Sequence, residues 1–83
     1  MDVTVKPLTY GEKAVGLSFN PGNSPKVEAI KRLSATLIDE IYNEEVAPGP
    51  DMRNGEKVAM AILAIRKIQE GQMWAVKAAT WQH

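Results

Sequence analysis

The stretch from Gly55 to Trp81, GEKVAMAILAIRKIQEGQMWAVKAATW, decides the fold of this chain. Alanine, methionine, leucine, isoleucine, glutamate, lysine and glutamine dominate it, and these residues give up little side-chain freedom on becoming helical. The composition therefore predicts one long helix over residues 55–81. At about 1.5 Å per residue this helix would span roughly 40 Å, which is long for a chain of 83 residues.

The two halves of this predicted helix differ in character. Val58 to Ile65 contains no polar side chain, and a helix that is apolar on all sides needs more neighbours than one partner helix can supply. In the second half, Trp74 and Lys77 are three residues apart and so share a face. That face suits a flat anionic ligand, although a core or interface position is the alternative for Trp74 and plain solvent exposure for Lys77. Gly71 lowers the stability of a helix by about 1 kcal/mol relative to alanine. We interpret the presence of glycine here as a sign that a neighbouring backbone packs closely against it.

A second helix is predicted from Pro25 to about Asn43. Ser24 is a good cap and proline fits the first helical position. Apolar residues recur at helical spacing from Val27, while Lys31 and most other charged residues lie on the opposite side. Residues 44–54 contain Pro48-Gly49-Pro50, which breaks the helix and lets the two helices fold back antiparallel.

The N-terminal part gives weaker signals. Residues 2–8 alternate loosely between polar and apolar, Tyr10-Gly11 resembles a turn, and Ala14 to Phe19 is a second short apolar stretch. We therefore expect residues 1–18 to form an extended or two-strand segment, followed by a turn at residues 19–24 that is rich in Asn, Pro and Gly. The predicted fold class is mainly α: one domain, residues 1–83, made of an antiparallel helical hairpin with this N-terminal segment and assembled as a homo-oligomer.

Composition and charge exclude several classes of function. Ten basic and ten acidic residues give a net charge of zero, which argues against binding polymeric nucleic acid. The chain has no cysteine, so we expect no disulfide, thiol nucleophile or zinc–thiolate site and a reducing compartment. The apolar run is too short to span a bilayer, and the sequence shows no signal peptide's apolar core. We expect a soluble cytoplasmic protein.

Catalytic chemistry is not predicted. The only histidine is His83, the last residue, so serine–histidine, cysteine–histidine and histidine–metal sites have no support. The adjacent carboxylates of Asp39-Glu40 are expected to be solvated charges. We expect no enzyme, no cofactor and no metal.

The candidates for ligand contacts are aromatic, cationic and amide side chains. Aromatic rings would stack on bases, cations would hold phosphates, and asparagines would contact base or ribose edges. Lys26 is disfavoured by the helix dipole in the first turn of its helix unless an anion binds there. Tyr10 could instead staple the N-terminus, the turn could serve only to position the helix, and Arg53 could be a free surface charge. The candidate residues are Tyr10, Phe19, Asn20, Asn23, Lys26, Arg53, Trp74 and Lys77.

Phe19-Asn20-Pro21 opens the first predicted helix, and MWAVKA, Met73 to Ala78, lies in the second. In this combination the chain resembles the helical-hairpin domain shared by phage anti-CBASS cyclic-nucleotide sponges and the related anti-Thoeris sponges. The resemblance covers Phe19 to Asp39 and Met60 to Thr80. Two departures are Gly71, where alanine is expected, and Leu17-Ser18, where a basic residue is frequent.

The resemblance implies a homo-oligomer, commonly a hexamer, that binds cyclic dinucleotides, cyclic trinucleotides or cyclic ADP-ribose isomers at subunit interfaces without cleaving them. Sequestration of these messengers in the cytoplasm of the infected bacterial host would protect the phage. Two other functions remain open. One is a helical protein-interaction module that uses the Trp74 face. The other is a small DNA-binding regulator, which the zero net charge and the Pro48-Gly49-Pro50 connection disfavour.

Overall fold

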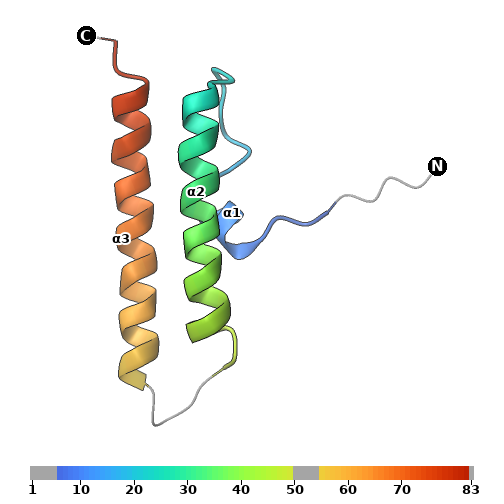
Figure 1. Ribbon diagram of the computed structural model, residues 1–83, viewed down its shortest axis with the longest axis vertical. Coiled ribbons are helices and arrows are strands. Elements are labelled where there is room, and N and C mark those ends of the chain that lie inside the picture. The colour runs from blue at the N-terminus through green and yellow to red at the C-terminus, as the bar shows by residue number, and fades with distance from the viewer. Residues whose placement is uncertain (1–5, 50–54, 83) are drawn as a thin grey trace, which may run out of the picture.

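The protein is mainly helical, as predicted. A computed structural model describes residues 6–49 and 55–82. Its elements are α1 (Tyr10–Ala14), α2 (Pro25–Ile41), the π-helical turn η1 (Tyr42–Val46) and α3 (Gly55–Ala79). Figure 1 shows α2 and α3 side by side and running in opposite directions, with the short α1 against α2. This arrangement is a helical hairpin.

The start of α2 confirms the predicted cap. The Ser24 hydroxyl accepts a hydrogen bond from the Val27 N–H at 3.3 Å, and Pro25 occupies the first turn. At the other end the backbone changes from α to π hydrogen bonding, and the Ala47 N–H donates to the Tyr42 carbonyl at 2.8 Å. Helical backbone therefore continues to Val46, beyond Glu44, where we expected the connection to begin.

The core lies along the line where α2 and α3 meet. Ile38 from α2 and Ile65 from α3 are the largest fully buried side chains, and Val15 and Ala35 complete the buried cluster. The all-round burial expected for residues 58–65 does not occur within one protomer, because Met60 is exposed together with Ile62 and Leu63. Within the described part of the chain, no helix is both long and apolar enough to cross a membrane.

The expected two-strand segment is wrong for the residues that the structure describes. Tyr10-Gly11 is the first turn of α1, and the chain then turns through Gly16, whose φ is +62°. The physical reason is a capping box: the Thr9 hydroxyl accepts from the Glu12 N–H at 3.1 Å, and the Glu12 carboxylate accepts from the Thr9 N–H at 2.8 Å. Residues 1–5, which carried part of the strand prediction, lie outside the described residues.

Gly11 brings α1 into close contact with α2. Its N–H donates to Asp39 Oδ1 at 2.7 Å, and a Cβ at this position would lie 2.1 Å from the Ala35 carbonyl oxygen. Only glycine allows this approach. The contact explains how so short a helix is held in place.

Candidate ligand-binding site

The loop between α1 and α2 is held by its own side chains. The Asn20 amide nitrogen donates to the Ser24 carbonyl at 3.0 Å, and the Asn20 amide oxygen accepts from the Ser24 N–H at 3.1 Å. Asn23 takes the left-handed conformation, with φ at +50°, which asparagine tolerates better than most residues. The Asn20 amide, predicted to contact a ligand, is thus bonded within the loop.

The burial of Lys31 beside this loop was not predicted from the sequence. Lys31 was placed on the polar side of its helix, yet it is only 6% exposed. Its ammonium group donates to the Gly16 carbonyl at 2.9 Å and to the Phe19 carbonyl, and it lies 5.5 Å from the centre of the Phe19 ring. Among the described residues no carboxylate lies within 4.0 Å of this ammonium. Lys31 therefore ties the loop to α2 through carbonyl groups.

A cavity of about 200 Å³ opens beneath this loop. Phe19 belongs to the loop, Lys31 to α2 and Val76 to α3, so three segments converge there. Phe19 is 72% exposed, which leaves much of its ring available at the rim. The full lining is Phe19, Asn20, Pro21, Gly22, Ser24, Val27, Lys31, Val76 and Thr80.

A second hollow, of about 330 Å³, lies on another side of the same loop. It brings Asn20 and Asn23 together with Arg32, whose Nε donates to Glu28 Oε1 at 3.0 Å. Lys26 is exposed in the adjacent first turn of α2. Phe19, Asn20, Asn23 and Lys26 therefore lie at the end of the hairpin where α2 begins.

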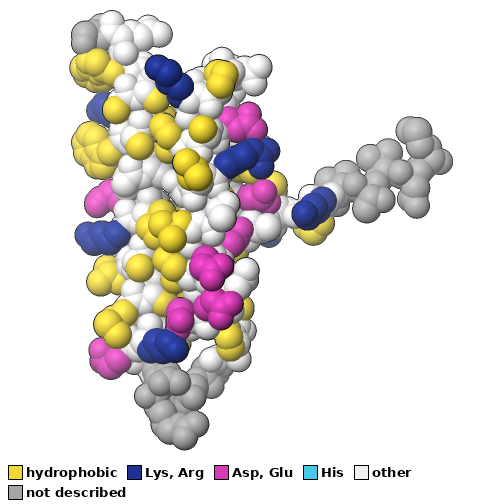
Figure 2. Space-filling view, viewed as in Figure 1, with side chains coloured by type: hydrophobic (Ala, Val, Ile, Leu, Met, Phe, Trp, Pro, Cys, Tyr) yellow, Lys and Arg dark blue, Asp and Glu magenta, His cyan; other side chains and the backbone are white. Residues whose placement is uncertain are grey.

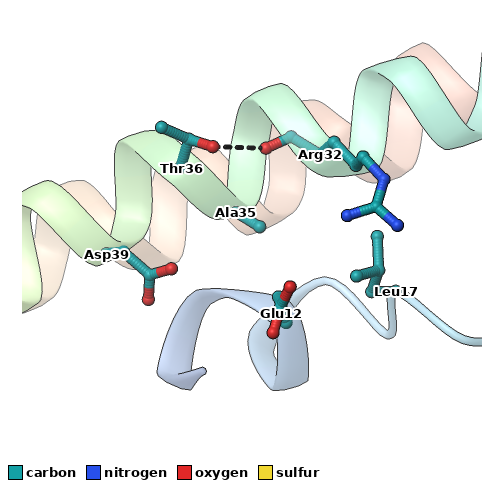
Figure 3. A pocket seen from close by; sticks show the side chains of 6 residues that line it. All are labelled: Glu12, Leu17, Arg32, Ala35, Thr36 and Asp39. Atoms are coloured by element: carbon teal, nitrogen blue, oxygen red, sulfur yellow. Dashed lines mark hydrogen bonds between the residues drawn. The ribbon is translucent and has the colours of Figure 1, made fainter. Parts of the chain in front are cut away.

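The seam between α1 and α2 contains a smaller cavity of about 110 Å³ (Figure 3). Figure 3 shows Arg32 and Asp39 projecting from α2 toward the segment that carries Glu12 and Leu17. The Thr36 hydroxyl donates to the Arg32 carbonyl at 2.9 Å, and one Asp39 oxygen is taken by Gly11. A cavity of this volume is too small for a nucleotide, so we regard it as part of the helix contact.

Tyr10 lies on the other side of the α1–α2 contact. Its ring stacks on the ring of Tyr42, with centroids 4.0 Å apart and planes within 5° of parallel. This contact fits the alternative role of Tyr10, in which its ring holds the N-terminal segment against the hairpin. It uses only one face of the Tyr10 ring, and the residue is still 41% exposed.

The C-terminal end of α3 forms a third group. Lys77 Nζ lies 5.4 Å from the centre of the Trp74 ring and 6.0 Å from that of Trp81, so Trp74 and Lys77 share a face as predicted. Trp74 is 65% exposed and so is not a core residue of the protomer. With Ala78 these residues line a wide hollow of about 470 Å³. Sequence reasoning missed Trp81, which follows the end of α3 at Ala79 and turns its ring toward Lys77.

The seven candidates that the structure describes thus belong to three separate parts of the protomer. Four surround the loop before α2, Tyr10 lies on α1, and Trp74 and Lys77 lie near the end of α3 (Figure 1). Arg53 lies outside the described residues. In the described part of the chain no cluster of three or more acidic, histidine or cysteine side chains could hold a metal ion.

Comparison with protein families identifies the hairpin. The family model described as "Acb2/Tad1, hairpin domain" matches residues 12–80. The chain belongs to this family. The Acb2/Tad1 hairpin is the domain of the anti-CBASS and anti-Thoeris sponges, so the resemblance found in the sequence is confirmed. Proteins of this family are binding sponges rather than enzymes.

The Acb2/Tad1 match covers α2, η1 and α3 completely and begins within α1. Every candidate contact except Tyr10 lies inside it. Comparison with curated proteins and with solved structures found no match.

Proposed function

We propose that this protein is a phage counter-defence sponge that binds cyclic nucleotide immune messengers and sequesters them without cleaving them. The messengers are cyclic dinucleotides, cyclic trinucleotides or cyclic ADP-ribose isomers, and the protein acts in the cytoplasm of the infected bacterial host. The observation that carries this proposal is the Acb2/Tad1 hairpin match over residues 12–80.

The geometry of the loop before α2 supports the proposal. Phe19 offers an exposed ring at the rim of a cavity, and Lys26 offers an exposed ammonium in the first turn of α2. Stacking of a base on an aromatic side chain contributes about 1–3 kcal/mol, and a nearby cation would neutralise a phosphate. Because the loop is already fixed by Asn20 and Lys31, binding requires little further ordering.

A homo-oligomer, in the family a hexamer, is part of the proposal. Within the protomer the Tyr10, Phe19 and Trp74 rings lie on different elements, so one protomer presents only part of a site for a ligand with two or three bases. Several large apolar side chains are also left exposed on the hairpin, including Leu33 on α2 and Met60 on α3. Association of copies would cover these side chains and bring aromatic and cationic groups of neighbouring copies together.

The test is calorimetric titration of the purified protein with cyclic dinucleotides, cyclic trinucleotides and cyclic ADP-ribose isomers, followed by heat release and chromatography of the ligand. A sponge that outcompetes a receptor needs a nanomolar Kd, about −12 kcal/mol, and must return the ligand unchanged. Recovery of a cleaved product would make the protein an enzyme. No heat with any ligand would remove the sponge function.

The exposed apolar side chains of α2 and α3 also favour a second candidate, a helical protein-interaction module. This function predicts an oligomer that binds no nucleotide of the panel and captures one defined host protein in stoichiometric amount. The same titration therefore separates the two candidates.

A further inference from the structure

The rings of Tyr10 and Tyr42 form a parallel stack. Tyr10 is the first residue of α1 and Tyr42 is the first residue of η1. Their ring centroids are 4.0 Å apart and their planes are within 5° of parallel. Aromatic pairs commonly have ring centroids about 4.5–7 Å apart, so these two rings are closer than usual. The two rings therefore form a close contact between α1 and η1.

Both rings are anchored by specific backbone features. Tyr10 is fixed because the next residue, Gly11, is bonded to Asp39 of α2 at 2.7 Å and because Thr9 and Glu12 cap α1. Tyr42 lies where α2 changes to π hydrogen bonding, with its carbonyl accepting from the Ala47 N–H at 2.8 Å. Single π turns are rare and occur often at functional sites.

The stack covers one face of Tyr10 and leaves the other available. Tyr42 is partly buried against the hydrophobic core, whereas Tyr10 is 41% exposed. Since Tyr42 occupies one face of the Tyr10 ring, a second flat group would have to stack on the opposite face.

We propose that Tyr42 is a positioning residue: it fixes the plane of Tyr10 so that the outer face of Tyr10 receives an adenine or another flat purine of the sequestered cyclic nucleotide. Tyr42 does not touch the ligand. This inference rests on the proposed sponge function and adds to it a residue and a ligand group. A base added to the outer face continues a stack that already exists, so the ring loses no further freedom on binding.

The experiment measures affinity in the full-length protein by calorimetry. The probe is whichever of cyclic di-AMP, cyclic tri-AMP and cyclic ADP-ribose the native protein binds most tightly. Tyr42→Leu keeps an apolar side chain but removes the flat ring, and we expect it to weaken binding about tenfold. Tyr42→Phe keeps the ring and should bind within twofold of the native protein.

A matched control separates positioning from stability. Val46 packs against the same core as Tyr42 from the other end of η1, so Val46→Ala disturbs that core without uncovering Tyr10. We expect Val46→Ala to lower thermal stability and leave affinity within twofold. Equal loss of affinity in Val46→Ala and Tyr42→Leu would show a general effect of stability and would overturn the proposal.

A second measurement uses the native protein, in case Tyr42→Leu does not fold. The chain has two tyrosines, so ring-labelled tyrosine gives two sets of proton signals, which Tyr42→Phe assigns. A purine on the outer face of Tyr10 should shift its ring signals upfield by more than those of Tyr42. Tight binding without a shift of Tyr10, or full affinity in Tyr42→Leu, would overturn the inference and leave the sponge function standing. Absence of binding by the native protein would remove both.

Discussion

A single backbone approach fixes α1 on the hairpin, and it can be tested at one residue. In Gly11→Ala the new Cβ would meet the Ala35 carbonyl oxygen at 2.1 Å and Asp39 Oδ1 at 2.9 Å. Because backbone atoms cannot move aside cheaply, we expect α1 to be displaced and the free energy of unfolding to fall by about 1–3 kcal/mol. Urea unfolding followed by circular dichroism measures this change. Gly22→Ala is the control, since nothing lies within 4 Å of a Cβ there. Equal stability of the two variants would contradict the close contact.

Lys31 is the second residue whose role depends on tertiary contacts. Lys31→Met keeps most of the side-chain volume but leaves the Gly16 and Phe19 carbonyls without this donor. Loss of a partner to a part-buried polar group costs about 1–3 kcal/mol, so we expect a loss of stability of that size by urea unfolding. Lys26→Met removes an exposed charge from the same helix and should have little effect on stability. If both variants unfold alike, Lys31 is not a structural tie.

Lys26 is expected to act on ligand binding rather than on stability. Its ammonium is exposed in the first turn of α2, where the helix dipole disfavours a cation unless an anion is bound. Lys26→Ala should therefore weaken calorimetric binding of the cyclic nucleotide at least tenfold with the oligomer intact. Lys57→Ala makes the same charge change in the first turn of α3, where Lys57 pairs with Glu45 at 2.9 Å, and should leave binding unchanged. Native affinity in Lys26→Ala would remove this residue from the site.

At the level of helices, Gly71 shows where a sequence argument needs the structure. We interpreted it as a contact with a neighbouring backbone, but among residues 6–49 and 55–82 nothing outside its own helix lies within 4 Å of a Cβ placed there. That interpretation is wrong for the protomer. Gly71→Ala should therefore add helix propensity and raise the free energy of unfolding by about 1 kcal/mol, measured by thermal circular dichroism. Dissociation of the oligomer, or a loss of stability, would show that a second copy's backbone occupies this position.

Local sequence signals, which depend only on residues close together in the chain, correctly predicted several features of this fold. Ser24-Pro25 marked the start of α2, composition marked α3, and the spacing of Trp74 and Lys77 placed them on one face. Contacts between distant residues were not predictable in the same way. The capping box at Thr9 is local and was overlooked, but the docking of α1 depends on Gly11 meeting Asp39 far along the chain.

In the candidate site, too, local features were predicted from the sequence and tertiary contacts were not. Phe19 and Asn20 were recognised from turn-forming residues, whereas burial of Lys31 depends on carbonyls of a loop that helical periodicity does not describe. The Tyr10–Tyr42 stack was hidden because the two rings come from different elements. Helical periodicity predicts the side of a helix on which a residue lies. It does not predict which residues of the preceding segment pack against that side.

For the molecule as a whole, the exposed apolar side chains provide a test of the proposed assembly. Figure 2 shows hydrophobic side chains along and between α2 and α3, while most of the acidic side chains in this view lie over or beside α2. Leu33 and Leu37 are 73% and 50% exposed and share a face of α2, and Met60 on α3 is 61% exposed. A protomer of 83 residues buries only about 60% of its unfolded surface, so covering these side chains would add substantially to stability.

Leu33→Lys tests this surface directly. A lysine at Leu33 is tolerated in a protomer where that position is exposed to solvent, but a charge buried between copies without a partner is strongly unfavourable. We expect the variant to keep its helical circular dichroism and to dissociate to smaller species in size-exclusion chromatography with light scattering. Asn43→Lys adds the same charge at another exposed position, in η1, and should leave the assembly unchanged. Because the proposed ligand sites form between copies, dissociation should also abolish tight binding of the cyclic nucleotide. Tight binding by a dissociated Leu33→Lys protomer would show that one copy holds the complete site.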